Sequence, residues 1–167
     1  MDIALLLARL LFGLGLAGHA LQKLFGWFGG PGIAGAGAIF ETLGFRPGAF
    51  FARTAALTEI TAAGLIVLGL FGPAGPALMV LIMLVACAAV WSNGFFAIRG
   101  GWEPAALYGM GGVLLEFNGP GRYSLDQLLG LMWLSTEQTA WIALGVALAA
   151  ALVNVGARRG PRAKNTG

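Results

Sequence analysis

A chain of 167 residues in which 58% are hydrophobic and only 10% are charged has too little polar surface to coat a soluble globule of its size. Its net charge of +3 does not indicate nucleic-acid binding, because four of its ten Lys and Arg lie at the C-terminus and no basic run alternates with aromatic residues. The single cysteine, Cys87, excludes an intrachain disulfide, a Cys-x-x-Cys redox pair and a thiolate metal site.

Five apolar segments are predicted to cross a membrane as helices, since about 20 apolar residues are needed to span the hydrocarbon core. They cover residues 3–22, 52–71, 77–98, 104–117 and 139–156. The N-terminal segment has an acid at position 2 and no basic stretch, which favours an uncleaved first span over a signal peptide. The fourth segment is short, at roughly 21 Å, and begins at Pro104, whose missing N–H costs nothing in a first helical turn.

The connections between these segments differ in character. Residues 23–51 form a long Gly-rich connection, and its middle (33–43) is apolar enough to lie in the membrane interface or to re-enter the bilayer. Residues 72–76 are predicted to form a tight turn, and residues 125–134 a short surface helix.

The distribution of Lys and Arg predicts the orientation in a bacterial-type inner membrane. With the N-terminus outside, the outer loops hold only Arg122. The cytoplasmic segments then hold Lys23, Arg46, Arg53, Arg99, Arg158, Arg159, Arg162 and Lys164. Because basic residues stay on the cytoplasmic side, five spans with the N-terminus outside and the C-terminus inside are predicted, with residues 158–167 as a disordered basic tail.

Ionisable residues inside spans cost about 2.5 to 3.5 kcal/mol each, so each one is a candidate functional residue. Arg9 and Glu116 both fall in the outer half of their spans. We predict that they form a structural ion pair, since each charge would offset the desolvation of the other.

A second polar set falls in the cytoplasmic half. It comprises His19, Gln22, Glu59, Asn93 and Tyr108, with Trp27 and Trp91 as aromatic residues of the same predicted pocket. Glu59 has no basic residue three or four positions away on its own helix, so its carboxyl is neutral or has a partner from another span. His19 is the predicted partner, because its titration range suits proton exchange near neutrality.

The same composition limits redox chemistry. One histidine cannot ligate haem from both sides, and the chain has neither a cysteine cluster nor a Glu-x-x-His motif. We therefore predict no metal site and no intrinsic cofactor. A redox role would need a diffusible quinone or a partner subunit.

Five motifs occur in an order and spacing typical of the DoxX family. They are HALQKLFGWFGGPG (19–32), LTEITAAGLIVLGL (57–70), SNGFF (92–96), GGWE (100–103) and GPGRYSLD (119–126). Over about residues 3–130 the chain thus resembles DoxX-like proteins, which implies a bundle of four membrane helices. The expected fold is an all-α membrane protein with a four-helix DoxX-type transmembrane bundle (1–134) plus a fifth C-terminal transmembrane helix (135–157).

The resemblance also implies functional positions. By motif match these are His19, Lys23, Glu59, Asn93, Gly121, Arg122 and Asp126. The family takes its name from subunits of a thiosulfate:quinone oxidoreductase, and some bacterial members are linked to membrane oxidoreductase complexes that handle oxidative and thiol stress. Family members often have a histidine shortly before NGFF, whereas this chain has Val90, Trp91 and Ser92 there.

The favoured function is a quinone-interacting or accessory membrane subunit of an oxidoreductase system. Its partners would be the lipid bilayer, oxidoreductase subunits and further copies of the chain. A quinone carbonyl would accept a hydrogen bond from His19 or Tyr108 while Glu59 relays a proton. Two alternatives remain: a small-solute or proton-coupled carrier, disfavoured by the odd number of spans and the lack of an inverted repeat, and a structural scaffold in which Arg122 and Asp126 organise a cap.

Overall fold

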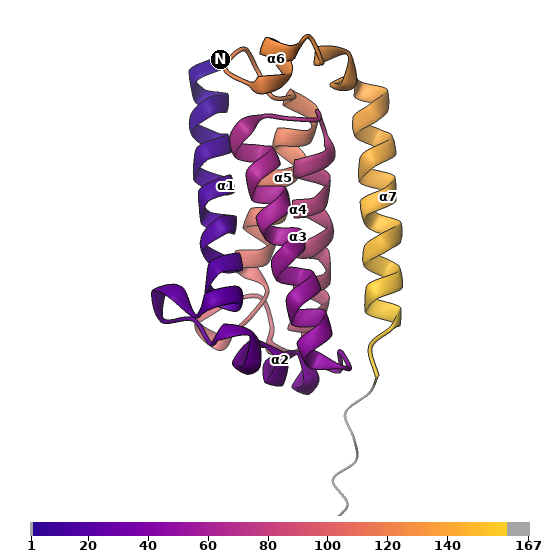
Figure 1. The fold of residues 1–167 in the computed structure, drawn as a ribbon. Helices are drawn as coiled ribbons and strands as arrows, with labels where there is room; N and C mark the ends of the chain where they lie inside the picture. The colour runs from indigo at the N-terminus through magenta and orange to yellow at the C-terminus, as the bar shows by residue number, and fades with distance from the viewer. Residues whose placement is uncertain (1, 160–167) are drawn as a thin grey trace, which may run out of the picture.

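Residues 2–159 are described by the computed structural model, and all its regular elements in that range are helices (Figure 1). Five long helices form an upright bundle: α1 (Asp2–Phe25), α3 (Gly48–Leu68), α4 (Ala74–Ala89), α5 (Glu103–Asn118) and α7 (Glu137–Gly156). Two short helices, α2 (Gly32–Thr42) and α6 (Leu125–Leu129), lie across opposite ends of the bundle, here called the α2 end and the α6 end. The predicted all-α membrane fold is confirmed.

The lengths of the helices fit a membrane bundle. Among the described residues, α1, α3 and α7 are long and apolar enough to cross a bilayer, and α4 is a shorter apolar helix. α4 and α5 each have 16 residues, or roughly 24 Å, and run side by side with the longer helices (Figure 1). α1 and α7 both run from the α6 end to the α2 end, as an odd number of crossings requires.

The predicted third span was too long. It was expected over 77–98, but α4 begins at Ala74 and ends at Ala89. Residues 91–93 and 97–99 form separate single turns, and Gly94 between them has a φ of 82°. The α-helix itself ends before these turns, at Val90, whose φ of −113° and ψ of 16° are not helical. The apolar run continues past this point, so hydropathy alone overestimated the length of the helix.

The second span is shifted from 52–71 to Gly48–Leu68, and its end is a Schellman motif. Gly69 has a φ of 62°, its N–H donates to the Ile66 carbonyl, and the N–H of Leu70 donates to the Leu65 carbonyl. The helix therefore ends inside an apolar stretch for a backbone reason. The chain then reverses direction, and α4 starts within the predicted 72–76 turn.

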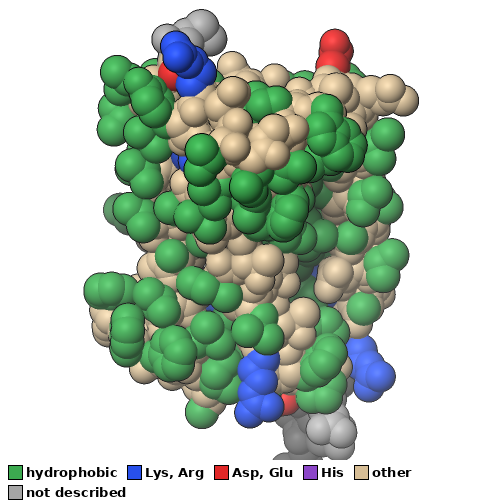
Figure 2. Space-filling model, turned by 45° about the horizontal axis from the view of Figure 1, so that its top comes forward, with side chains coloured by type: hydrophobic (Ala, Val, Ile, Leu, Met, Phe, Trp, Pro, Cys, Tyr) green, Lys and Arg blue, Asp and Glu red, His purple; other side chains and the backbone are tan. Residues whose placement is uncertain are grey.

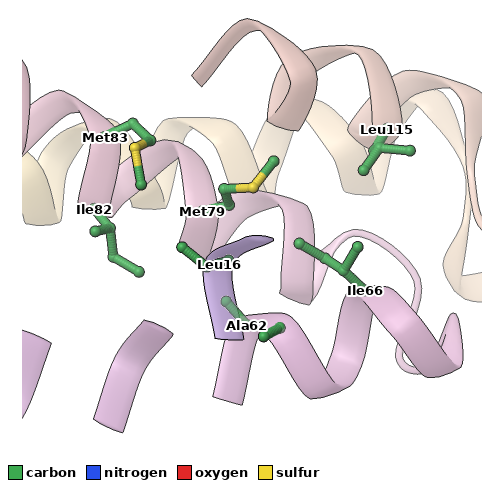
Figure 3. Packing of buried hydrophobic residues seen from close by; sticks show 8 residues of the cluster. Leu16, Ala62, Ile66, Met79, Ile82, Met83 and Leu115 are labelled. Carbon is green, nitrogen blue, oxygen red and sulfur yellow. The ribbon is translucent and has the colours of Figure 1, made fainter. Parts of the chain in front are cut away.

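Small residues allow the helices to pack closely. α1 packs on α3, α3 on α4, and α4 on both α5 and α7. At Gly13 a Cβ atom would come 2.5 Å from a methyl of Val67, so α1 and α3 approach as closely as glycine permits. The buried cluster between the helices (Figure 3) consists of Leu16, Ala62, Ala63, Ile66, Met79, Ile82, Met83 and Leu115.

The outer surface of the bundle is apolar. Leu11, Leu114 and Leu152, on α1, α5 and α7, are between 63% and 71% exposed. Figure 2 shows hydrophobic side chains over much of one face. Exposed apolar surface of this extent on several helices matches the hydrocarbon of a bilayer.

The predicted orientation is tested by single cysteines at the two ends. Arg99 and Arg122 are both exposed, the first at the α2 end and the second at the α6 end. In a Cys87→Ala background, we expect Arg99→Cys to react with a membrane-impermeant thiol reagent only from the cytoplasmic side, and Arg122→Cys only from the outside. Labelling of both from the same side would exclude the five-span arrangement.

Candidate functional site

A partly buried ion pair joins α1 to α3 near the α2 end. Lys23 lies in the last turn of α1, and its Nζ is 2.8 Å from both carboxylate oxygens of Glu59 on α3. The Glu59 side chain is 5% exposed and that of Lys23 is 23% exposed. Among the described residues this is the one salt bridge, and its two-oxygen geometry offsets the cost of burying the carboxylate.

The expectation that His19 pairs with Glu59 was wrong, because the carboxylate pairs with Lys23. The sequence placed Lys23 beyond the first span. α1 instead continues to Phe25, and the flexible lysine side chain reaches back along the helix to the carboxylate. The ammonium also donates to the backbone carbonyl of His19, at 3.3 Å.

His19 and Tyr108 form the second part of the site. Their rings meet edge to face, with centroids 5.8 Å apart and planes at 77°. The His19 side chain is exposed on the flank of α1, and Tyr108 on α5 is half-buried against Phe12. A Cβ atom at Gly15 would collide with the Tyr108 hydroxyl, so this glycine makes room for it.

These contacts connect four residues from three helices. Tyr108 touches His19, Lys23 bonds to the carbonyl of His19, and Lys23 pairs with Glu59. We call these four residues the α1 cluster. It holds one imidazole, one phenol, one ammonium and one carboxylate, of which the imidazole faces outward and the carboxylate faces inward.

Three of the other predicted pocket residues lie in connections at the α2 end. Asn93 is exposed and donates to the Gly100 carbonyl at 3.0 Å. Trp91 stacks on Trp102, with ring centroids 4.9 Å apart. Asn93 and Trp91 therefore make these contacts within the 90–102 loop. Trp27 is 56% exposed and packs beside Phe25. The sequence predicted a single pocket in the cytoplasmic half of the spans, but the structure divides its residues between the helices and the loops.

Gln22 lies near the C-terminal end of α1, one residue before Lys23. Gly30 lies directly against its backbone, where a Cβ atom would come 2.5 Å from the Gln22 carbonyl oxygen. The side chain of Gln22 is half-buried. Its position thus fixes the turn that leads from α1 to α2.

Arg9 has a structural environment at the α6 end. It is 3% exposed, and its Nε donates to the Ile66 carbonyl at 2.9 Å while Nη2 donates to the Val67 carbonyl at 2.8 Å. Nη1 donates to the carbonyls of Pro120 and Tyr123 at 2.6 and 2.8 Å. The guanidinium thus satisfies carbonyls in the last turn of α3 and ties the 120–123 loop to it.

The predicted ion pair between Arg9 and Glu116 does not form. Glu116 is 4% exposed, and both its carboxyl oxygens are buried without a hydrogen-bond partner. One turn earlier on α5, Gly112 lies against Val80 and Met79 of α4. The Arg9 guanidinium instead donates to carbonyls of α3 and of the 120–123 loop, and none of its hydrogen bonds goes to Glu116.

Glu116 therefore gives a prediction of its own. A buried polar group without a partner costs about 1 to 3 kcal/mol, so Glu116→Leu should raise the free energy of unfolding by about that amount. Glu116→Gln, which keeps a polar group there, should change it little. Chemical unfolding in detergent micelles measures both variants, and a destabilised Glu116→Leu protein would show that the carboxyl has a partner.

Three family-motif residues organise the α6 end. Asp126 is fully buried, and its two carboxylate oxygens accept from the backbone N–H groups of Phe71 and Gly72 at 2.8 and 2.6 Å. Gly121 has a φ of 73°. The backbone N–H of Arg122 donates to Asp2 at 3.3 Å, and the Arg122 side chain is exposed. The hydrogen bonds of Asp126 hold the α3–α4 turn against α6.

Comparison with known proteins gives a family but no solved relative. A family model described as DoxX matches residues 4–92. An uncharacterized membrane protein of Mycobacterium tuberculosis is 34% identical over 134 residues, which cover 72% of this chain and 78% of that protein. No solved structure matches the chain.

Proposed function

The chain belongs to the DoxX family of membrane proteins, and from that premise we propose that it is a quinone-interacting or accessory subunit of a membrane oxidoreductase system. One observation carries the proposal. The α1 cluster combines an outward-facing imidazole with a buried carboxylate and its ammonium partner, inside helices whose other faces are apolar. Intramembrane ionisable groups of this kind are costly and mark ligand or proton pathways.

The geometry supports lateral access for the ligand. His19 is exposed on the flank of the bundle, so a quinone head group reaches it from the lipid without passing between helices. A quinone carbonyl there accepts a hydrogen bond from the His19 imidazole or the Tyr108 hydroxyl. Electrons come from a partner subunit.

The ion pair supplies the proton side of the proposal. Lys23 is partly exposed and Glu59 is buried, so Lys23 lies between the surrounding medium and the carboxylate. Glu59 relays a proton toward the quinone, and Lys23 holds the carboxylate in place between turnovers. With the α2 end in the cytoplasm, as the basic residues favour, protons are drawn from that side.

The test measures quinone bound to purified protein. We expect wild-type protein, extracted in mild detergent or nanodiscs, to retain quinone detectable by mass spectrometry. Glu59→Gln should fold, because glutamine has nearly the same shape, but should lose about tenfold or more of the bound quinone. Glu116→Gln is the matched control, since it removes another buried carboxyl at the opposite end.

The outcomes separate the candidate functions. Equal quinone content in the wild type, Glu59→Gln and Glu116→Gln would reject the quinone site. Uptake of a solute into liposomes that depends on pH and on Glu59 would indicate a carrier instead. If neither quinone binding nor uptake is detected, the structural scaffold stands.

A further inference from the structure

The flank of α3 carries a shallow groove of about 350 Å³. It is lined by Thr54, Leu57, Thr58 and Thr61 of α3 and Leu78 of α4. The lining residues of α3 cover about 10 Å along the helix axis. The buried face of the same helix, which includes Glu59, turns toward α1, so the groove is separate from the α1 cluster.

The groove is mainly apolar, and two of its three threonine hydroxyls are bonded within α3. The Thr54 hydroxyl donates to the Phe50 carbonyl at 3.0 Å, and the Thr58 hydroxyl donates to the Thr54 carbonyl at 2.8 Å. Because these hydroxyls bond to their own helix, they present methyl groups to whatever lies in the groove. Such a surface suits a hydrocarbon chain better than a polar ligand.

Positive charge lies at the α2 end of this groove. Arg53 directly precedes Thr54 and lies four residues before Leu57, which puts it on the same face of α3. Arg53 is exposed, and its side chain makes no hydrogen bond or salt bridge within residues 2–159. Figure 2 shows basic side chains at the lower edge of the face, below hydrophobic ones.

Two further arginines lie at the same end. Arg46 is in the connection that leads into α3, and the backbone N–H of Arg159 donates to the Gly44 carbonyl at 2.9 Å. Neither side chain has a hydrogen-bonded partner in the described part of the chain. The nearby acid, Glu41, accepts from the Gly48 N–H at 3.2 Å. The charge around the start of α3 is therefore positive.

We propose that this groove binds an anionic phospholipid. One acyl chain lies along Thr54, Leu57 and Thr61, and the phosphate lies beside Arg53 at the membrane surface. Charge complementarity selects an anionic head group, because each Lys or Arg near the surface attracts anionic lipid by an amount equivalent to about a fivefold change in binding. The length of the apolar groove selects a lipid over a free phosphate.

Native mass spectrometry in mild detergent tests the head group. Phosphatidylglycerol and phosphatidylcholine with identical acyl chains are added separately. We expect preferential retention of phosphatidylglycerol and a loss of about fivefold in Arg53→Gln. Arg122→Gln is the matched control, because Arg122 is also exposed but lies at the α6 end. Equal binding of the two lipids, or equal effects of the two substitutions, would overturn the proposal.

A second pair of variants tests the groove. Thr61→Phe should fill it and displace phosphatidylglycerol, whereas Leu114→Phe adds a ring to an exposed position on α5 and should leave binding unchanged. Binding that survives Thr61→Phe would place the lipid elsewhere. A dimer that Thr61→Phe dissociates would show that a second copy occupies the groove, which would also overturn the lipid assignment.

Discussion

Lys23→Met is expected to lower the free energy of unfolding by about 3 to 5 kcal/mol, because it leaves the Glu59 carboxylate buried without a partner. Glu59→Gln should cost less. In Glu59→Gln the unpaired Lys23 side chain, already 23% exposed, can turn outward to water or lipid head groups. In Lys23→Met the unpaired Glu59 carboxylate, at 5% exposure, cannot reach water. Chemical unfolding of the purified protein in one detergent measures both changes.

The double variant separates stability from function. Lys23→Met combined with Glu59→Leu removes both charges, so it should recover most of the stability lost in Lys23→Met alone. The same double variant should still lack bound quinone if the proposed function is correct. A double variant no more stable than Lys23→Met would contradict the ion pair, and one that retains quinone would contradict the role of Glu59.

Arg9→Leu is expected to produce a loss of similar size, about 3 to 5 kcal/mol. The substitution leaves four carbonyl oxygens without their donor, of which two belong to the last turn of α3. Arg9→Lys should recover little, since an ammonium is a compact charge that does not reproduce the planar arrangement of guanidinium donors. Thermal unfolding followed by circular dichroism compares the two variants.

The combination of Arg9→Leu with Glu116→Leu tests how these residues are related. Because they do not touch, the two changes in free energy should add: a loss from Arg9→Leu and a gain from Glu116→Leu. A double variant much more stable than that sum would show that the two charges interact after all.

Several features of the site followed from the sequence. The depth of each charged residue along its helix was predictable from its distance to the ends of an apolar segment, and this singled out Arg9, Glu59 and Glu116, all of which are buried. The signals for the end of α3 were also present, since Gly69 follows a long apolar run. Lys23 was a candidate functional residue only through its family motif, because the predicted end of the first span excluded it from the membrane.

The sequence by itself determined that this is a helical membrane protein, because a chain that is 58% hydrophobic and arranged in segments of membrane-spanning length has no soluble alternative. The tertiary structure alone decided which polar groups meet. The depth of a residue in the membrane is not enough to predict its partner. Two side chains make contact only if the rotation of each helix about its axis also turns them toward each other. Arg9 donates to the carbonyls of α3, Glu116 is buried without a hydrogen-bond partner, and Lys23 reaches Glu59 because α1 packs against α3. Packing of small residues sets those rotations, and no pattern within a single helix records them.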